Sequence, residues 1–560
     1  MKQEIKAFLN RITGEEAEVS VPETESFGHY STNLALKISK KQGKPAAEVA
    51  EKIRDIVQKE SPEFLEKVEA LNGFLNFWVK PEAIRAKLEQ ISKDMDSFGQ
   101  SKAGSGKEVI VEYSQPNIAK QMHAGHLRNT ILGEAIARIY ENLGWKVTRW
   151  NWIGDWGTQF GILIAAYKKW GGETDFNENP IEKLEALYVR FNAEIEKNPE
   201  LKESGREEFK KLEEGDPENR KLWEHFKELS LKEIDGIYSL LDISFDTYVG
   251  EAFFEKDMQP LVKKLLDSGV AEKSEGAVIV RLDKEGLPPA LIQKSDGASL
   301  YLARDIATLE YREKENHPAK ILYVVGNEQT LEFEQLFAVA DKMGVARDIE
   351  KEHVKYGLIL GEDKKKMSTR RGTAVSVRGL VEEAIRRAGA IVNEKNPELP
   401  EEEKQKVARA IGVGALKYFL LRENRLSDIV FDWEAMLDMK GDSAPYIQYA
   451  YARLRSIERK SGEIGKYDLS ALGEEELKIA RKIFEFPDII REAEKNYAPN
   501  LISEYIYSFS GLLNRFYETH PVLKEEDEGK KNAYLFLINS GAQILKKGLE
   551  ILGITVLEEI

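Results

Sequence analysis

One stretch of about 45 residues limits the possible folds more than any other feature of this chain. Residues 108–113 have the pattern of a buried strand, residues 127–143 that of a helix, and residues 146–152 that of a second strand. Two strands joined by a crossover helix over so short a distance indicate a βαβ unit, and therefore a parallel sheet. Further strands of the same sheet are predicted at 277–280, 320–325 and 356–360.

At 560 residues the chain is too long for one packed core, and its pattern changes along its length. Residues 1–105 predict a small α+β or α/β unit, residues 106–379 the sheet domain, and residues 380–560 a helical region. Within the sheet domain, residues 168–273 are rich in Glu and Lys with helical periodicity, which indicates an insertion. We therefore predict an α/β chain with an added domain at each end.

Composition excludes several classes of protein. The chain has no cysteine, so disulfides, thiolate zinc sites and cysteine nucleophiles are all ruled out. Its 82 basic and 97 acidic residues give a net charge of −15, which argues against nonspecific coating of nucleic acids. We find neither an apolar run of membrane-spanning length nor the apolar core of a signal peptide at the charged opening, and we expect a cytoplasmic protein without a membrane partner.

Two of the seven histidines stand in His123-Ala124-Gly125-His126, where the first predicted strand gives way to its helix. A helix N-terminus attracts phosphate, glycine lets a nucleotide approach the backbone, and imidazoles can donate hydrogen bonds to phosphate oxygens. The alternatives are one capping and one packed histidine, or a zinc site. No third metal ligand lies nearby in the sequence, so we predict no bound metal.

Five cations fall within residues 364–371, after the strand predicted at 356–360. On charge alone this would be an ordinary solvated loop. Open α/β sheets, however, bind ligands at the carboxyl ends of their strands, and such a loop would meet an anion there. The sequence therefore predicts two phosphate-binding segments on one sheet.

The two segments, HAGH at 123–126 and KMSTR at 366–370, resemble the signature motifs of class I aminoacyl-tRNA synthetases, and their surroundings resemble the arginyl-tRNA synthetase family. Nearly the whole chain takes part in the resemblance. The matching segments are 27–33, 73–77, 114–120, 154–161, 301–305, 444–453 and 516–518. Three positions depart from the family's pattern: Thr369 replaces the second lysine of the loop motif, Glu332 precedes Phe333 where a histidine is common, and Trp152 precedes the Gly-Asp-Trp-Gly run.

The resemblance implies a Rossmann-like catalytic domain, an N-terminal domain for the tRNA elbow, and a helical region that contacts the tRNA stem and anticodon. It implies ATP-dependent ligation of L-arginine to its cognate tRNA through an arginyl-adenylate, with release of AMP and pyrophosphate. Mg²⁺ would come with ATP, and the chain would act as a monomer. Because polar pairing can reject analogues by large factors, we expect no editing domain.

The same resemblance implies residue roles. Catalysis is assigned to His123, His126 and Lys366. The residues expected to bind ATP are Lys120, His123, Gly125, His126, Lys366, Met367, Ser368 and Arg370. The residues expected to bind arginine are Glu112, Asn117, His126, Tyr301, Asp305 and Gln329. Carboxylates suit the guanidinium fork, so Asp305 and Glu112 would take that group with help from the Tyr301 hydroxyl.

Candidate contacts for tRNA lie in the two end regions. The resemblance implies that Phe74 and Asn76 contact the tRNA elbow. The candidates for the anticodon are Tyr446, Gln448, Tyr449, Tyr451 and Arg453, because aromatic and arginine side chains hold unstacked bases. The alternative for each tyrosine is a place in an aromatic core stripe.

Two other functions compete with arginine ligation. A related nucleotidyltransferase would share the two-histidine motif but would not need the helical last third. A silent RNA-binding relative would bind tRNA without using ATP, which the retained His123, His126 and Lys366 argue against. A Walker NTPase is ruled out, because Gly106-Lys107 has neither the required first glycine nor a following Ser or Thr.

Overall fold

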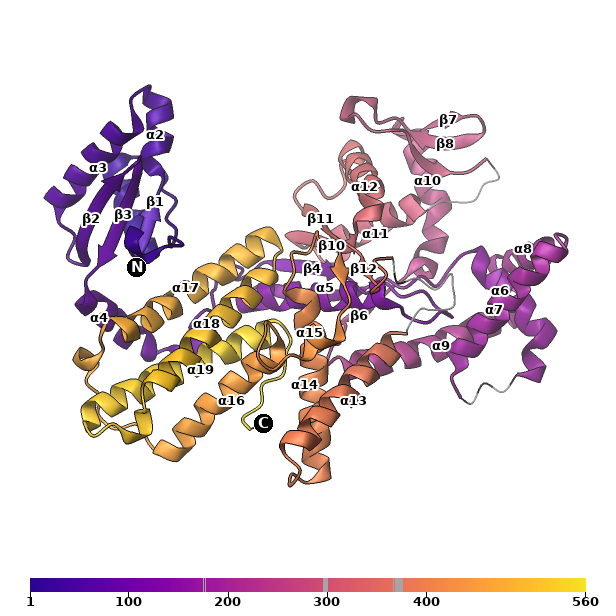
Figure 1. Cartoon of the computed structure of the whole chain (residues 1–560). Helices are drawn as coiled ribbons and strands as arrows, with labels where there is room; N and C mark the ends of the chain where they lie inside the picture. Colours follow the sequence, from indigo (N-terminus) through magenta and orange to yellow (C-terminus); the bar gives the residue numbers. More distant parts are fainter. Residues whose placement is uncertain (175, 177, 296–300, 366, 368–375, 560) are drawn as a thin grey trace.

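A computed structural model of the chain describes residues 1–559 except 175, 177, 296–300, 366 and 368–375 (Figure 1). At its centre is a five-stranded parallel sheet in the order β11-β10-β4-β5-β6. The strands are β4 (Glu108–Glu112), β5 (Lys146–Asn151), β6 (Thr247–Tyr248), β10 (Lys320–Gly326) and β11 (Glu350–Tyr356). The predicted fold class, a Rossmann-like α/β domain with an added domain at each end, is confirmed.

Both faces of the sheet are covered by helices, which explains why residues 109–111 of β4 and 321–325 of β10 form continuous apolar runs. In β4, Val109 and Val111 pack into the cluster that includes α5 (Ala124–Asn142). Ile110 faces the opposite side and packs with α11 (Tyr301–Glu315) and α12 (Thr330–Met343). All three strand side chains are fully buried, so β4 is held firmly from both sides.

Two predicted strands do not join the parallel sheet. Residues 277–280 form β8 (Ala277–Val280), but it pairs antiparallel with β7 (Glu272–Ser274) and β9 (Ala290–Gln293) in a separate sheet. The strand predicted at 356–360 is wrong in its bounds, because β11 ends at Tyr356. Gly357 donates its N–H to the Arg425 carbonyl, which turns the chain into β12 (Ile359–Leu360), and β12 pairs with β13 (Ile429–Val430). A short apolar run indicates a strand but does not reveal its partner.

Helices dominate the segment between β5 and β8. They are α6 (Thr158–Trp170), α7 (Pro180–Lys197), α8 (Leu201–Glu213), α9 (Pro217–Leu240) and α10 (Met258–Asp267). The segment also returns to the central sheet, where β6 pairs with β5. Residues 168–273 therefore rejoin the central sheet through β6, near the C-terminal end of the segment.

The two end regions lie beside each other in Figure 1, where the N-terminal region stands near α17. Gln3 donates to Asp488 at 2.9 Å, and Lys478 pairs with Glu25 at 3.0 Å. The N-terminal region has a three-stranded antiparallel sheet in the order β1-β3-β2. Its strands are β1 (Tyr30–Thr32), β2 (Leu65–Leu71) and β3 (Phe74–Val79). Its helices are α1 (Lys2–Thr13), α2 (Leu34–Gln42), α3 (Ala46–Glu60) and α4 (Pro81–Ser92). The C-terminal region is helical, as predicted: α13 (Val377–Lys395), α14 (Glu401–Leu421), α15 (Trp433–Leu437), α16 (Ala444–Ser461), α17 (Glu474–Asn496), α18 (Asn500–Thr519) and α19 (Glu528–Ile551).

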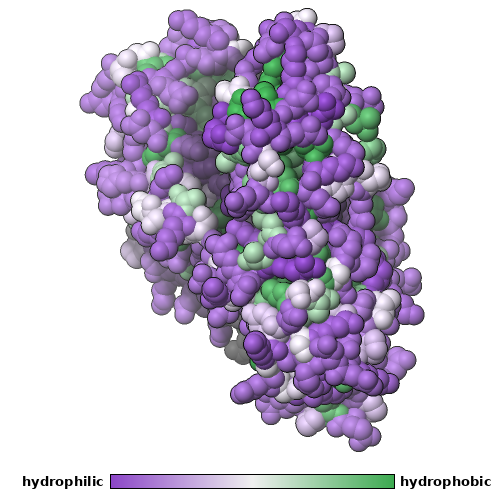
Figure 2. Space-filling view, turned by 90° about the vertical axis from the view of Figure 1, so that its left-hand side faces the viewer, coloured by the Kyte–Doolittle hydropathy of each residue, from purple (hydrophilic) through white to green (hydrophobic). Residues whose placement is uncertain are grey.

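Hydrophilic side chains cover most of the face that Figure 2 shows, and the apolar ones appear there as small separate patches. The described helices include none that combines the length and the apolar character needed to cross a membrane. The larger apolar side chains instead gather in the clusters between sheet and helices.

Candidate functional site

A cleft opens at the carboxyl edge of the parallel sheet. Glu112, Gly326 and Tyr356, the last residues of β4, β10 and β11, all line it. The cavity has a volume of about 690 Å³. This is the position at which open α/β sheets bind their ligands.

The cavity brings together most of the residues that the sequence singled out for ATP and arginine. These are Glu112, Asn117, Lys120, His123, Gly125, His126, Tyr301, Asp305, Gln329 and Met367. Lys366, Ser368 and Arg370 lie outside the described residues. Met367 donates its N–H to the Ile359 carbonyl at 3.2 Å, which places Met367 beside β12.

The two histidines of the HAGH motif cap the N-terminus of α5. The Gly125 N–H donates to Nδ1 of His123 at 3.1 Å, and the His123 N–H donates to Nδ1 of His126 at 3.2 Å. Since each Nδ1 accepts a hydrogen bond, each neutral ring carries its proton on Nε2. Burial, and the neighbouring His123, lower the pKa of His126 to about 3, so this ring is neutral at pH 7. The motif thus provides two Nε2–H donors at a positive helix end.

Arg128, one turn further along α5, is a member of the site that the sequence analysis missed. Its guanidinium is buried and donates to the carbonyls of Leu358 at 3.0 Å, Arg425 at 3.1 Å and Ser427 at 2.8 Å. Burial lowers the pKa of Arg128 to about 10, so it keeps its charge at pH 7. It therefore joins α5 to the segments that precede β12 and β13 and adds a positive charge to the side of the cleft where the HAGH motif lies.

The opposite side of the cleft is acidic. Tyr301 is the first residue of α11, and Asp305 follows one turn later, as the spacing predicted. Burial raises the pKa of Asp305 well above its ordinary value, and the nearby Glu112 and Glu251 raise it further. Burial also raises the pKa of Glu251 to about 7 and that of Glu332 in the same direction. Such a group of carboxyls favours a cation as its ligand.

Glu112 differs from the others, because it already has a cationic partner. One carboxylate oxygen accepts a hydrogen bond from the buried guanidinium of Arg312, and the other accepts one from Gln115 Nε2 at 2.8 Å. Arg312 also lies over the ring of Trp150. Its charge offsets that of Glu112, whereas Asp305, Glu251 and Glu332 line the same cleft with pKa values that burial raises.

Glu251 was not found from the sequence. It begins a short 3₁₀ helix, Glu251–Asp257, inside the segment interpreted as an insertion, and only the fold brings it to the cleft. Glu332 was noted only as a departure from a family pattern. Other polar residues that line the cleft, and to which the sequence analysis assigned no role, are Ser114, Gln115, Asn129, Gln159, Glu328 and Tyr356.

The predicted anticodon contacts divide into surface and interior positions. Tyr449 is 38% exposed, and the Arg453 guanidinium lies over its ring, 5.2 Å from the centroid. Gln448 is fully buried and donates to the carbonyls of Ala410 and Thr555. Tyr451 is buried and donates to Glu558. Burial removes Gln448 and Tyr451 from the surface that an RNA can touch, and we correct both assignments.

Three other candidates for tRNA contact differ in exposure. Tyr446 is partly buried against Tyr507, and its hydroxyl accepts a hydrogen bond from Asn514 at 3.0 Å. Phe74 is 42% exposed at the start of β3. Asn76 is buried, and its side-chain oxygen accepts a hydrogen bond from the Ser31 hydroxyl at 2.8 Å, so its role is to hold β3 against β1.

Comparison with known families gives matches along nearly the whole chain. Three family models match it: the arginyl tRNA synthetase N-terminal domain at residues 1–79, the class I (R) tRNA synthetase catalytic domain at residues 87–433, and the DALR anticodon binding domain at residues 447–560.

Curated relatives and solved structures point in the same direction. The arginine–tRNA ligase of Clostridium botulinum is 39% identical over 100% of this chain and 98% of the relative. That of Clostridium perfringens is 41% identical over 96% and 94%. The arginyl-tRNA synthetase structures of Plasmodium falciparum (27% identity, 100% and 99% coverage) and Thermus thermophilus (26% identity, 100% of both chains) each give a TM-score of 0.85.

Proposed function

The chain belongs to the arginyl-tRNA synthetase family of class I aminoacyl-tRNA synthetases, and from this premise we propose how its cleft joins arginine to tRNA. Members of the family use ATP with Mg²⁺ and proceed through an adenylate, and the chain accordingly catalyses ATP-dependent ligation of arginine to tRNA. The match to the anticodon binding domain argues against a nucleotidyltransferase that acts without tRNA.

One observation supports the two binding sites proposed here most strongly. A single cavity has the N-terminus of α5 with its two histidines on one side and carboxyls of raised pKa on the other. We assign the triphosphate to the first side. The Nε2–H groups of His123 and His126 would donate to phosphate oxygens, and Gly125 gives the nucleotide room. Lys120, with Lys366 and Arg370 of the loop outside the described residues, would offset the charge of the departing pyrophosphate.

We assign the guanidinium of arginine to the acidic side. Asp305 offers two oxygens to the planar fork, Tyr301 a hydroxyl, and Glu251 a second carboxylate. Glu112 remains near the amino acid but, already paired with Arg312, contributes less to its binding than we expected from the sequence. Asn117, Gln329 and His126 would hold the α-amino and carboxylate end.

Activation then requires mainly positioning and charge stabilisation. The arginine carboxylate attacks the α-phosphorus of ATP, and the bond to pyrophosphate breaks on the opposite side. The histidine donors and the cations stabilise the charge that develops on the phosphate oxygens. In the second step a terminal ribose hydroxyl of the tRNA, the 2′-hydroxyl by family analogy, attacks the adenylate carbonyl and releases AMP.

For tRNA we propose that residues 1–105 contact the elbow through Phe74, and that residues 380–560 contact the stem and anticodon through Tyr446, Tyr449 and Arg453. Exposure of Phe74 and Tyr449 supports these contacts. Residues 106–379 hold the catalytic cleft. As the family resemblance implies, we also propose that the chain acts as a monomer, in the cytoplasm with the tRNA that it charges.

Pyrophosphate exchange and tRNA charging with purified components test the function. Exchange should require arginine and should appear when the cognate tRNA is present. Lysine tests the shape of the cation, and citrulline tests its charge, because citrulline keeps the shape of arginine without the positive charge. Equal charging with lysine, or no charging of any arginine tRNA, would contradict the proposal.

The raised pKa values predict that arginine binding depends on pH. In the empty cleft Glu251 is protonated below its pKa of about 7, and the pKa of Asp305 is raised as well. A bound guanidinium favours the ionised carboxylates, so binding releases protons. Ionisation of Glu251 should therefore raise the affinity as the pH approaches about 7, by up to about tenfold per pH unit for the proton released, and this contribution should then level off.

Calorimetric titration of arginine in buffers of different protonation enthalpy measures that release directly. Glu251→Gln is the matched variant, and it should flatten the rise near pH 7 while the dependence due to Asp305 remains. Affinity that stays constant over this range, with no proton released, would show that these carboxyls do not meet the guanidinium.

A further inference from the structure

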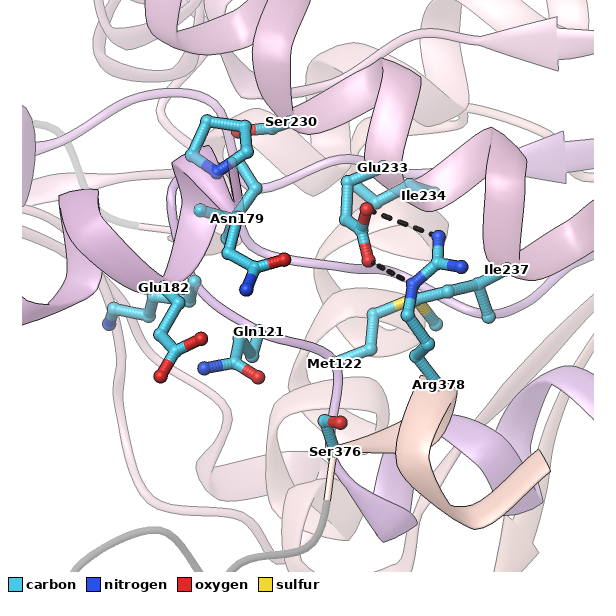
Figure 3. Close-up of a pocket in the computed structure, with 13 residues that line it drawn as sticks. Gln121, Met122, Asn179, Glu182, Ser230, Glu233, Ile234, Ile237, Ser376 and Arg378 are labelled. Carbon is cyan, nitrogen blue, oxygen red and sulfur yellow. Dashed lines mark hydrogen bonds and ion pairs between the residues drawn. The ribbon is translucent and has the colours of Figure 1, made fainter. Parts of the chain in front are cut away.

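A second, smaller cavity has a volume of about 130 Å³ (Figure 3). Lys120 lines both this cavity and the main cleft, so the two adjoin. Four segments meet around the smaller cavity: the loop at 120–122, the start of α7, the middle of α9 and the start of α13. Two of them, α7 and α9, belong to the 168–273 segment, whose role the sequence did not reveal. The cavity is thus where that segment meets the surroundings of the HAGH motif.

One ion pair joins α9 to α13 across this cavity, and Figure 3 shows its two parallel bonds. Arg378 donates from Nε to one oxygen of Glu233 at 2.7 Å and from Nη2 to the other at 3.1 Å. Such bidentate geometry fixes orientation as well as distance. The side chains of Arg378 and Glu233 are 36% and 35% exposed, so the pair adds little to the stability of the fold. Its effect is to fix the orientation of α13 relative to α9.

A glycine opposite the ion pair provides the room that the guanidinium needs. Gly236 lies within α9, one turn after Glu233, where glycine is less favourable than alanine. A Cβ at this position would lie 2.8 Å from Nη2 of Arg378. Any larger residue at position 236 would displace the guanidinium. Gly236 and Glu233 together therefore define the position that the Arg378 guanidinium occupies.

From Arg378 a short chain of contacts leads to the catalytic cleft. Ser376 caps α13 by accepting the Gly379 N–H at 3.1 Å, and it pairs with His123 in an antiparallel bridge. Val377 donates its N–H to the Met122 carbonyl at 2.9 Å. The first residues of α13 therefore fix the backbone of Met122 and His123.

We propose that Glu233, Gly236 and Arg378 form a clasp through which the 168–273 segment positions His123 for arginine activation, an inference that rests on the proposed function. The clasp residues do not line the main cleft, so they act as positioning residues. If Arg378 is released, α13 and the Ser376–Val377 pairing can shift, and the Nε2–H of His123 moves from its place. Misplacement by about 1 Å can lower a rate by up to about a hundredfold.

Three variants loosen the clasp in different ways. Arg378→Lys keeps the positive charge but loses the bidentate pairing with Glu233. Glu233→Gln keeps the shape of the side chain but loses its negative charge. Gly236→Ala displaces the Arg378 guanidinium. For each we expect kcat of pyrophosphate exchange, measured with tRNA present, to fall about tenfold. The Kd for arginine should stay within about twofold, because the acidic side of the cleft is untouched.

Gly236→Ala separates positioning from stability most clearly. Alanine favours a helix over glycine, so the melting temperature should stay equal or rise while kcat falls. A purely structural role predicts that activity follows stability. Unchanged kcat in Gly236→Ala, or a fall in kcat matched by a fall in melting temperature, would overturn the clasp.

The control is an ion pair of the same kind within α13. Arg386 donates to Glu383 from Nε and Nη2, each at 2.7 Å, and Arg387 donates to the same carboxylate at 2.6 Å. Glu383→Gln removes the charge from both pairs without touching α9. Its kcat should stay within about twofold of the parent value, and the double variant Glu233→Gln with Arg378→Lys should lose no more than either single variant. An equal loss in Glu383→Gln, or additive losses in the double variant, would contradict the proposal.

An inactive parent enzyme would overturn the proposed function as well, whereas an active parent with unaffected variants would overturn the clasp alone.

Discussion

Asp305→Asn is expected to lower kcat/KM for arginine by about a thousandfold while the KM for ATP changes little. The substitution keeps the shape of the side chain and removes the charge that faces the guanidinium. Truncating one partner of a buried, hydrogen-bonded charge pair typically costs about 2–5 kcal/mol, and about 4 kcal/mol corresponds to that factor. Steady-state pyrophosphate exchange with arginine and ATP varied separately measures both constants.

Citrulline provides the control for this variant. The parent enzyme should prefer arginine strongly, whereas Asp305→Asn should narrow the preference, because an asparagine amide can pair with the neutral urea group. A variant that keeps full discrimination between arginine and citrulline would remove Asp305 from the guanidinium site.

The same variant should not weaken the fold. An aspartate whose pKa is raised in the folded chain binds its proton more tightly there, so its contribution to stability falls as the pH rises. At about pH 8 the parent chain carries this unfavourable contribution, whereas Asp305→Asn does not. Its melting temperature should then equal or exceed that of the parent, which separates loss of binding from unfolding.

Much of the cleft could be predicted because its signals are local in the sequence. The HAGH motif stands between a buried strand and a helix, and the spacing of Tyr301 and Asp305 is one helical turn, so short segments carry the information. The strand at 277–280 was also recognised, but nothing in four apolar residues says which sheet they join.

What the sequence did not reveal depends on contacts between distant segments. Glu251 reaches the cleft only because β6, a strand of two residues, returns the chain to the central sheet. The pairing of Glu112 with Arg312 joins residues 200 positions apart, and it changes Glu112 from a free carboxylate into a neutralised one. Gln448 and Tyr451 share a helix with exposed residues, and packing against α14 and the C-terminal residues buries them.

Three substitutions of His126 should separate its two nitrogens. The imidazole Nδ1 accepts the His123 N–H as part of the helix cap, and this leaves Nε2–H to donate to phosphate. Alanine removes both functions, and asparagine can still accept at the Nδ1 position. Glutamine instead places an amide N–H where Nε2 stood. Losing a donor that meets developing charge costs about 10²–10³ in kcat.

We therefore expect His126→Ala and His126→Asn to lose activity by that factor, with the asparagine variant keeping the melting temperature of the parent because its cap remains. His126→Gln should recover at least about tenfold over alanine in pyrophosphate exchange, since it restores a donor near the phosphate. Arginine affinity should decrease only modestly in all three, because the guanidinium end keeps its partners. If asparagine were as active as the parent, the helix cap alone would explain His126, and the role assigned to its Nε2–H would be wrong.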